Sequence, residues 1–156
     1  MNFNRIGLVG ALCAASFFGN TSALAGDTAT VGVSASVTGT CKFNSGGTIA
    51  FTLDQTTTAA ATGTVTSPAF WCTKGTGYTV SDNNGVNALA GARRMKHASI
   101  ATEFIPYSFS YTTTGTGTGK TTPITLTLTA ATVVNTDFIN ASAGSYADTV
   151  TLSITP

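Results

Sequence analysis

The residues that could do chemistry in this chain are few, and their spacing argues against the common catalytic motifs. Gly119-Lys120-Thr121 matches the end of a phosphate-binding loop, but the first glycine of that motif would stand at position 114, which is Thr114. His97 is the single histidine, and no Gly-x-Ser-x-Gly nucleophile elbow occurs. The acidic residues are scattered, so no pair is placed for sugar hydrolysis. We therefore predict a protein that is not an enzyme, with no catalytic residue, cofactor or small-molecule substrate.

The first residues have the features of a secretory signal peptide. Arg5 precedes an apolar run over Ile6–Phe18, and Ala23-Leu24-Ala25 is a small-x-small cleavage signal. The run is too short for a stable membrane span, and no later stretch is long enough to cross a bilayer. We predict that residues 1–25 are removed before Gly26 and that residues 26–156 are exported, passing through the periplasm to the cell surface or the extracellular space.

Two cysteines remain after removal of the leader, Cys41 and Cys72. An even number of cysteines in an oxidising compartment favours a disulfide. A zinc site is the alternative, but two cysteines and the distant His97 do not supply four ligands. We predict a disulfide between Cys41 and Cys72 and no metal site.

The charge and composition of residues 26–156 suit an assembling β protein. Lysine and arginine balance aspartate and glutamate, so the basic excess expected of a nucleic-acid-binding protein is missing. Threonine is the most frequent residue and suits a solvated strand face, whereas glycine marks turns. So little charge leaves weak repulsion between copies, which an assembling subunit tolerates better than a soluble enzyme.

Apolar residues alternate along most of the chain and predict short strands separated by turns. Pro68 interrupts one of them and indicates an edge or bulge. Asp82-Asn83-Asn84-Gly85 predicts a turn, and the segment from there to about Thr102, with the basic Arg93–His97 cluster, is predicted to be a solvated loop. Seven strands and no convincing helix indicate an all-β, immunoglobulin-like β-sandwich. The inward-facing rows are Ile49, Phe51 and Leu53; Tyr78 and Val80; Ile105, Tyr107, Phe109 and Tyr111; Ile124, Leu126 and Leu128; Tyr146, Val150, Leu152 and Ile154.

The stretch Thr28–Val37 follows the leader directly and has a period of two. Its apolar row is Ala29, Val31, Val33, Ala35 and Val37. An apolar strand in an N-terminal arm can fill a groove in its own domain or in that of another copy. Pattern alone leaves both readings open, and a first strand folded in its own domain is the simpler one.

Five segments of the chain carry a resemblance to a known family: Cys41–Phe43, Phe70–Val80, Ala92–Met95, Ile105–Tyr111 and Ala143–Leu152. Together they resemble the spore coat protein U domain family, whose members include the subunits of archaic chaperone–usher pili. The resemblance covers most of residues 28–156, and its most specific parts surround the second cysteine and the C-terminal strand. Thr52-Leu53-Asp54 departs from the family pattern, so the resemblance implies the fold but not the geometry of that loop.

The resemblance implies a sandwich that lacks its last strand. In this family a periplasmic chaperone fills the resulting groove temporarily, and the N-terminal strand of the next subunit then replaces it; an outer-membrane usher serves the assembly. The implied organisation is a donor-strand extension over residues 26–40 and an incomplete, pilin-type sandwich over residues 41–156. The implied edge of the groove is the C-terminal strand with Tyr146, Asp148, Val150, Leu152 and Ile154.

We therefore expect a subunit of a secreted surface fibre that polymerises by donor-strand exchange and serves adhesion or biofilm formation. Its partners would be copies of itself or related pilins, the chaperone and the usher. Two alternatives remain at this point: a self-complemented spore-coat or surface protein, and a sugar-binding adhesin domain.

Overall fold

The structure is a computed structural model that describes residues 26–156, so the predicted signal peptide lies outside the described residues. The chain divides into two units, Met1–Ala35 and Ser36–Pro156. Residues 26–40 form neither helix nor strand. Among the described residues, no helix is long and apolar enough to cross a membrane.

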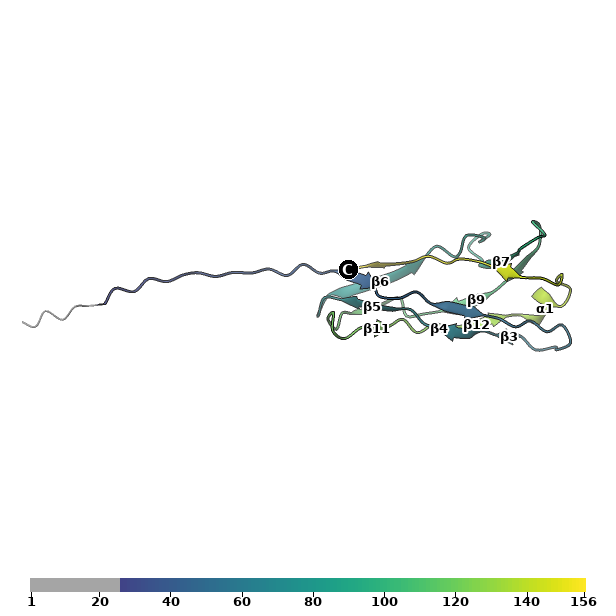
Figure 1. Ribbon diagram of the computed structural model, residues 1–156, viewed down its shortest axis with the longest axis horizontal. Helices are drawn as coiled ribbons and strands as arrows, with labels where there is room; N and C mark the ends of the chain where they lie inside the picture. The colour runs from purple at the N-terminus through teal and green to yellow at the C-terminus, as the bar shows by residue number, and fades with distance from the viewer. Residues whose placement is uncertain (1–25) are drawn as a thin grey trace, which may run out of the picture. The chain divides into compact units, whose positions relative to one another are not determined.

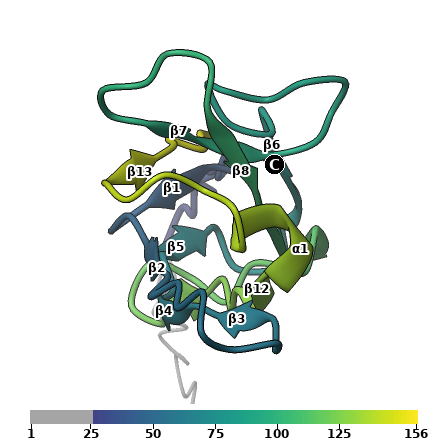
Figure 2. The same cartoon turned by 90° about the vertical axis from the view of Figure 1, so that its right-hand side faces the viewer.

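Residues 36–156 form a sandwich of short antiparallel strands (Figures 1 and 2). One layer contains β1 (Cys41–Phe43), β5 (Ala69–Cys72) and β11 (Ile124–Thr125); β2 (Thr48–Ala50) with β4 (Thr64–Thr66); and β3 (Ala61–Thr62), β12 (Thr129–Val133) and β9 (Ser108–Ser110). The other contains β10 (Thr114–Thr116), β6 (Gly77–Asp82) and β14 (Leu152–Thr155), and β13 (Tyr146–Ala147), β7 (Arg94–His97) and β8 (Phe104–Pro106). The helix α1 (Asn135–Phe138) is a single turn. The predicted all-β, immunoglobulin-like sandwich is confirmed.

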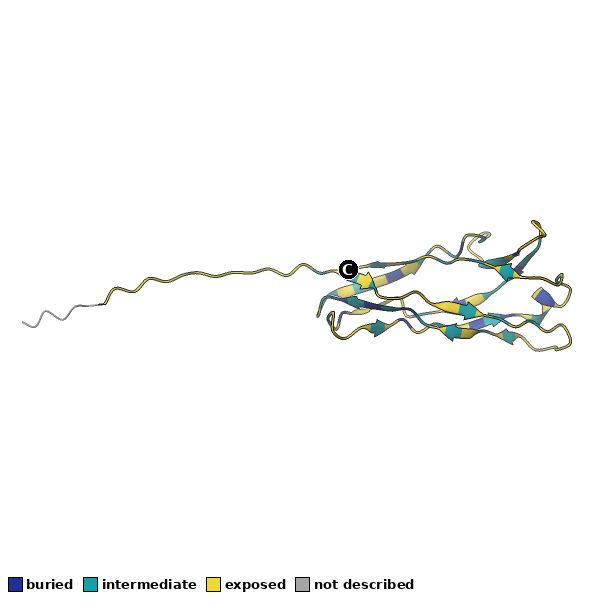
Figure 3. Cartoon of the chain, viewed as in Figure 1, coloured by how far each residue is buried: buried dark blue, intermediate teal, exposed yellow. Residues whose placement is uncertain are grey.

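The core consists of two clusters of buried side chains between the layers (Figure 3). Phe70 and Cys72 of β5 meet Val80 of β6 in the first cluster. Ile105 of β8 and Val133 of β12 meet in the second, beside the helix. The alternation predicted for Tyr78 and Val80 and for Ile105–Tyr111 is confirmed, because every second residue of β6, β8 and β9 points inward.

Pro68 divides what the sequence suggested as one strand into β4 and β5, as its lack of an N–H requires. It is fully buried, and its carbonyl accepts the N–H of Leu126 at 2.9 Å. The interruption is therefore a packed corner and not a loop.

The predicted solvated loop around Arg93–His97 is wrong. Arg94–His97 is β7, which pairs with β8 and β13, and His97 is only 6% exposed. Its Nδ1 accepts the backbone N–H groups of Ser99 and Ile100 at 3.0 and 2.9 Å. The strand was not predicted because Met95 is surrounded by three cations, so the segment shows no apolar alternation. Pairing with distant strands forms the strand in spite of this low local preference.

Candidate functional site: a groove between two unpaired strand edges

Two strand edges of the sandwich have no partner strand within residues 26–156. On one side, β1 pairs only with β5 and β2 only with β4. On the other, β14 pairs only with β6 and β13 only with β7. A hollow of about 820 Å³ lies between these edges, lined on one side by residues from Phe43 to Phe51 and on the other by Tyr146 to Leu152.

The hollow continues toward the helix end of the domain. A second hollow of about 1030 Å³ is lined by residues 49–56 and 141–146. The two share four lining residues, so together they form one groove along the sandwich. The shared residues are Ile49, Phe51, Met95 and Tyr146.

The floor of the groove is apolar and aromatic. Phe51 and Tyr107 pack with ring centroids 6.2 Å apart, and Tyr107 stacks on Phe109 at 6.3 Å. Leu128 and Leu152 continue this surface toward the first core cluster. Such a strip of half-buried hydrophobic side chains suits the alternate side chains of an extended chain.

The backbone of the C-terminal edge is available for pairing. The carbonyls of Ser145, Thr149 and Thr151 accept N–H groups from the chain segments that flank β6 and β7. Because backbone groups alternate in direction along a strand, the even-numbered residues turn their N–H and C=O groups to the open edge. These are the five predicted edge residues. Tyr146, Asp148, Val150 and Leu152 line the hollow, and Ile154 packs on the first core cluster.

Asp148 anchors this edge to the aromatic floor. Its Oδ2 accepts the Tyr107 hydroxyl at 2.7 Å, and its Oδ1 accepts the backbone N–H and the Nδ2 of Asn87 at 3.1 and 3.0 Å. Burial and the hydrogen bond to Asp148 raise the pKa of Tyr107 far above its ordinary value. Gly85 packs so closely that a Cβ there would collide with the carboxylate. Asp148 therefore holds a stretch of the edge that forms no regular strand.

A second hydrogen-bond network joins Phe109 and Tyr111 to Asp82 of β6. Asp82 accepts hydrogen bonds from Arg93 Nη2 at 2.7 Å and from the Tyr111 hydroxyl at 2.6 Å, and the Arg93 guanidinium lies 4.2 Å from the Phe109 ring centroid. Desolvation opposes the charge on Asp82, but the hydrogen bonds outweigh it and lower the pKa of Asp82. Burial first, and then Asp82, raise the pKa of Tyr111 to about 12.

Tyr146 fixes the helix end of the groove. Its ring meets His97 edge to face at 4.8 Å, and its hydroxyl lies 2.8 Å from Glu103 Oε1. The same Glu103 oxygen accepts the N–H of Ser142 at 2.5 Å, which lowers the pKa of Glu103. No sequence spacing links these residues, so sequence reasoning missed the role of Glu103 and assigned none to Tyr146 beyond its position.

The predicted disulfide between Cys41 and Cys72 is confirmed. The two residues face each other across β1 and β5. The bond therefore fastens one edge of the groove to the buried core. Among residues 26–156, no group of three histidine, cysteine, aspartate or glutamate side chains is placed to hold a metal.

The predicted donor row has no strand partner in the described chain, and residues 28–37 belong to no strand. Its members Val31, Val33 and Val37 are 85%, 91% and 83% exposed, and Ala29 and Ala35 are exposed as well (Figure 3). Their role as a donor strand stays a prediction.

Comparison with known proteins gives similarities of two kinds, to a family model and to a solved structure. A family model described as the Spore Coat Protein U domain matches residues 27–153. A chain in the crystal structure of the CsuC–CsuE chaperone–tip adhesion subunit pre-assembly complex, from archaic chaperone–usher Csu pili of Acinetobacter baumannii, is 26% identical with a TM-score of 0.46. The match covers 76% of this chain and 40% of that one, so this chain spans less than half of its length. No curated protein matches the chain significantly.

Proposed function

We propose a function from two premises: this chain belongs to the Spore Coat Protein U domain family, and its sandwich has an open groove between two unpaired edges. The protein is a structural subunit of a pilus-type fibre on the cell surface, and the groove receives a strand from a neighbouring subunit. The observation that carries the proposal is the groove itself, because it combines an apolar floor with unpaired backbone groups.

The incoming strand binds by β-augmentation. Its backbone pairs with the even-numbered residues of the C-terminal edge, and its alternate side chains enter the groove. Each valine that becomes buried contributes about 1.5–2 kcal/mol, and each ladder hydrogen bond adds about 0.5–1.5 kcal/mol. Over ten residues this is a large stabilisation.

The donor is the segment Thr28–Val37 of another copy. Its row of small and β-branched residues has the period of two that the groove requires, and Val31, Val33 and Val37 are exposed in the described chain. Ala35 provides one short side chain in this row for a shallow part of the groove. Donation in trans links subunit to subunit, so copies form a linear fibre.

Before assembly the groove needs a temporary cover. An open apolar groove beside two unpaired strand edges is a hazard for aggregation. A periplasmic chaperone that supplies a strand of its own removes this hazard, and an outer-membrane usher then exchanges it for the donor. Adhesion and biofilm formation are the functions that such a fibre serves.

The test is polymerisation of the purified, exported protein, followed by gel electrophoresis without heating. We expect a ladder that collapses to one band on heating. Deletion of residues 26–37, or Val33→Asp, is expected to abolish the ladder while chaperone capture is kept. Leu89→Asp is the matched control, because Leu89 is also exposed, at 61%, but lies outside the arm and lines neither hollow.

Unchanged fibres after deletion of residues 26–37 would falsify donation by this arm. A single band from the unmodified protein at every concentration would instead favour the self-complemented reading of the fold.

A further inference from the structure

Three of the lysines gather at one end of the domain. Lys42 of β1 stands opposite Trp71 of β5, and Lys120 Nζ lies 5.8 Å from the centroid of the Trp71 ring. Lys74 belongs to the same end, because the neighbouring Gly75 N–H donates to the Gly117 carbonyl at 2.9 Å. The segments that build this end, residues 38–48, 68–78 and 112–125, contain no aspartate or glutamate. We call Lys42, Lys74 and Lys120 the lysine end.

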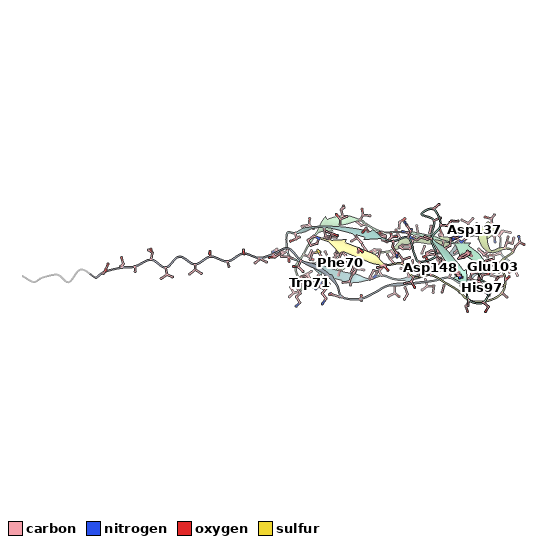
Figure 4. All side chains as sticks on the ribbon, turned by 90° about the horizontal axis from the view of Figure 1, so that it is seen from above. Phe70, Trp71, His97, Glu103, Asp137 and Asp148 are labelled. Atoms are coloured by element: carbon pink, nitrogen blue, oxygen red, sulfur yellow. A yellow bond between two sulfur atoms is a disulfide. The ribbon has the colours of Figure 1, made fainter. Side chains whose placement is uncertain are left out.

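Three carboxylates gather around the helix at the other end of the domain. Asp137 is on α1, Asp54 precedes a loop whose Gln55 donates to the Phe138 carbonyl at 3.0 Å, and Glu103 accepts the N–H of Ser142. Figure 4 shows Asp137 and Glu103 at the opposite end of the sandwich from Trp71. We call Asp54, Glu103 and Asp137 the acidic end.

These carboxylates are not used inside the domain as ion pairs. Within residues 26–156, the recorded salt bridge joins Arg93 to Asp82, which belong to neither end. Of the other nearby cations, Arg94 lies over the Phe104 ring, at 4.2 Å, and Lys96 is exposed on β7. Hydrogen bonds lower the pKa of Asp54 and of Glu103, so both are ionised at neutral pH.

The N-terminal arm joins the sandwich at the lysine end, whereas the groove opens at the acidic end. The chain enters the sandwich at the lysine end, where the Thr73 N–H donates to the Thr40 carbonyl at 2.9 Å. The second hollow, lined by residues 49–56 and 141–146, opens at the acidic end. Only three residues separate Val37 from Cys41, so a bound arm places the lysine end of the donor copy close to the groove end at which Val37 emerges.

We propose that the lysine end of each copy docks on the acidic end of the next copy, and that this charge match sets the direction in which the arm enters the groove. An arm antiparallel to Tyr146–Thr155 emerges at the acidic end and brings opposite charges together. A parallel arm would emerge at the other end and place lysines against lysines. The contact is heterologous, head to tail, as a growing fibre requires. This inference rests on the proposed function.

The expected effect of these charges is mainly on the rate and direction of assembly. Exposed ion pairs add little to affinity, but complementary charged patches speed encounter and suppress wrong orientations. Screening shortens their range to about 10 Å at 0.1 M salt and about 3 Å at 1 M. The docking is therefore sensitive to salt, whereas the apolar groove is not.

The test compares charge reversals in the full exported chain at 20 mM and 500 mM NaCl. Reversal of one end, by Lys74→Glu with Lys120→Glu or by Asp54→Lys with Asp137→Lys, is expected to slow ladder formation about threefold to tenfold at low salt. The difference is expected to fall below about twofold at high salt. Reversal of both ends in one chain restores the rate, because lysine again meets carboxylate. Lys96→Glu is the control for a change of net charge, because Lys96 is exposed on β7 beside Phe104 and its reversal leaves lysines opposite carboxylates, so the ladder should form no more slowly than with the unmodified chain.

The outcomes separate this inference from the proposed function. A normal ladder at an unchanged rate in both single-end variants overturns the docking and leaves donor-strand exchange standing. The docking is also overturned if each single-end variant is slow and the chain with both ends reversed is equally slow. If the unmodified protein forms no ladder, the proposed function fails, and zero-length carbodiimide cross-linking at low salt decides the docking. Links between Lys74 or Lys120 of one copy and Asp54 or Asp137 of another support it, and their absence overturns it.

Discussion

The closed and open sides of this sandwich are built from the same alternation of apolar residues, yet only one side is fully buried. Phe70, Cys72 and Val80 are at most 1% exposed. Phe43 and Leu152 pack on the same cluster but stay partly exposed, because no strand of the described chain covers them. Alternation determines which side chains face inward, and the presence of a neighbouring strand determines how far they are buried.

The largest effect is expected from truncation on the closed side. Phe70→Ala removes a fully buried ring that contacts Phe43 and Tyr78, so it should lower the free energy of unfolding by about 3–5 kcal/mol. Phe43→Ala at the groove should cost the free subunit about half as much. Urea denaturation of both variants measures the contrast, and equal losses would mean that the groove is already closed in the free subunit.

Loss of the disulfide is expected to come next. Cys41→Ser with Cys72→Ser opens a link between residues 31 positions apart and should lower the free energy of unfolding by about 2–4 kcal/mol, with the size depending on the unfolded state. The bond joins an open edge to the closed core, so the loss should also weaken strand binding. Denaturation with and without reductant, using the unmodified protein as control, measures it.

A substitution that displaces Asp148 should lower the free energy of unfolding by a smaller amount. Gly85 has φ +93°, and a Cβ there would strike the Asp148 carboxylate, so Gly85→Ala should cost about 1–3 kcal/mol. Gly91 is the matched control, because its φ is +81° but a Cβ would meet no atom within 4 Å. Thermal unfolding of the two variants separates loss of the anchor from backbone strain alone, and equal losses would show that the Asp148 contact contributes nothing.

The smallest effect is expected from the Asp82 network and depends on pH. The pKa of Asp82 is lowered, so its contribution is present above the unfolded pKa of about 3.9 and is lost as pH falls. The pKa of Tyr111 is raised to about 12, so its contribution is fully present below the unfolded pKa of about 10 and is lost as pH rises from there through about 12. Tyr111→Phe should cost about 1 kcal/mol at pH 7 and flatten the alkaline loss of stability. An unchanged profile between pH 9 and 12 would exclude the Tyr111 hydroxyl as its source.

Much of the fold was readable from the sequence because it depends on local pattern. Ile105, Tyr107 and Phe109 show their inward direction by alternation, Pro68 shows the break between β4 and β5, and the two cysteines of residues 26–156 could pair only with each other. The strand Arg94–His97 was missed, because its pairing partners are distant and its own residues are mostly charged.

Of the groove, the sequence by itself showed the alternation of Tyr146–Ile154 and of the apolar arm, since both are periodic patterns within ten residues. The assignment of the first as a groove edge came from the family resemblance, and the role of the arm as a donor strand stays a prediction. The tertiary structure alone decided what holds the edge in place. Tyr107 reaches Asp148 across 41 positions, and Tyr146 reaches Glu103 across 43. The separation of lysines and carboxylates to opposite ends was likewise invisible in a chain whose charges nearly cancel. Short-range periodicity can be read directly from the order of the residues. These contacts instead join residues that are far apart in the sequence, so they depend on how the packed sandwich brings distant segments together.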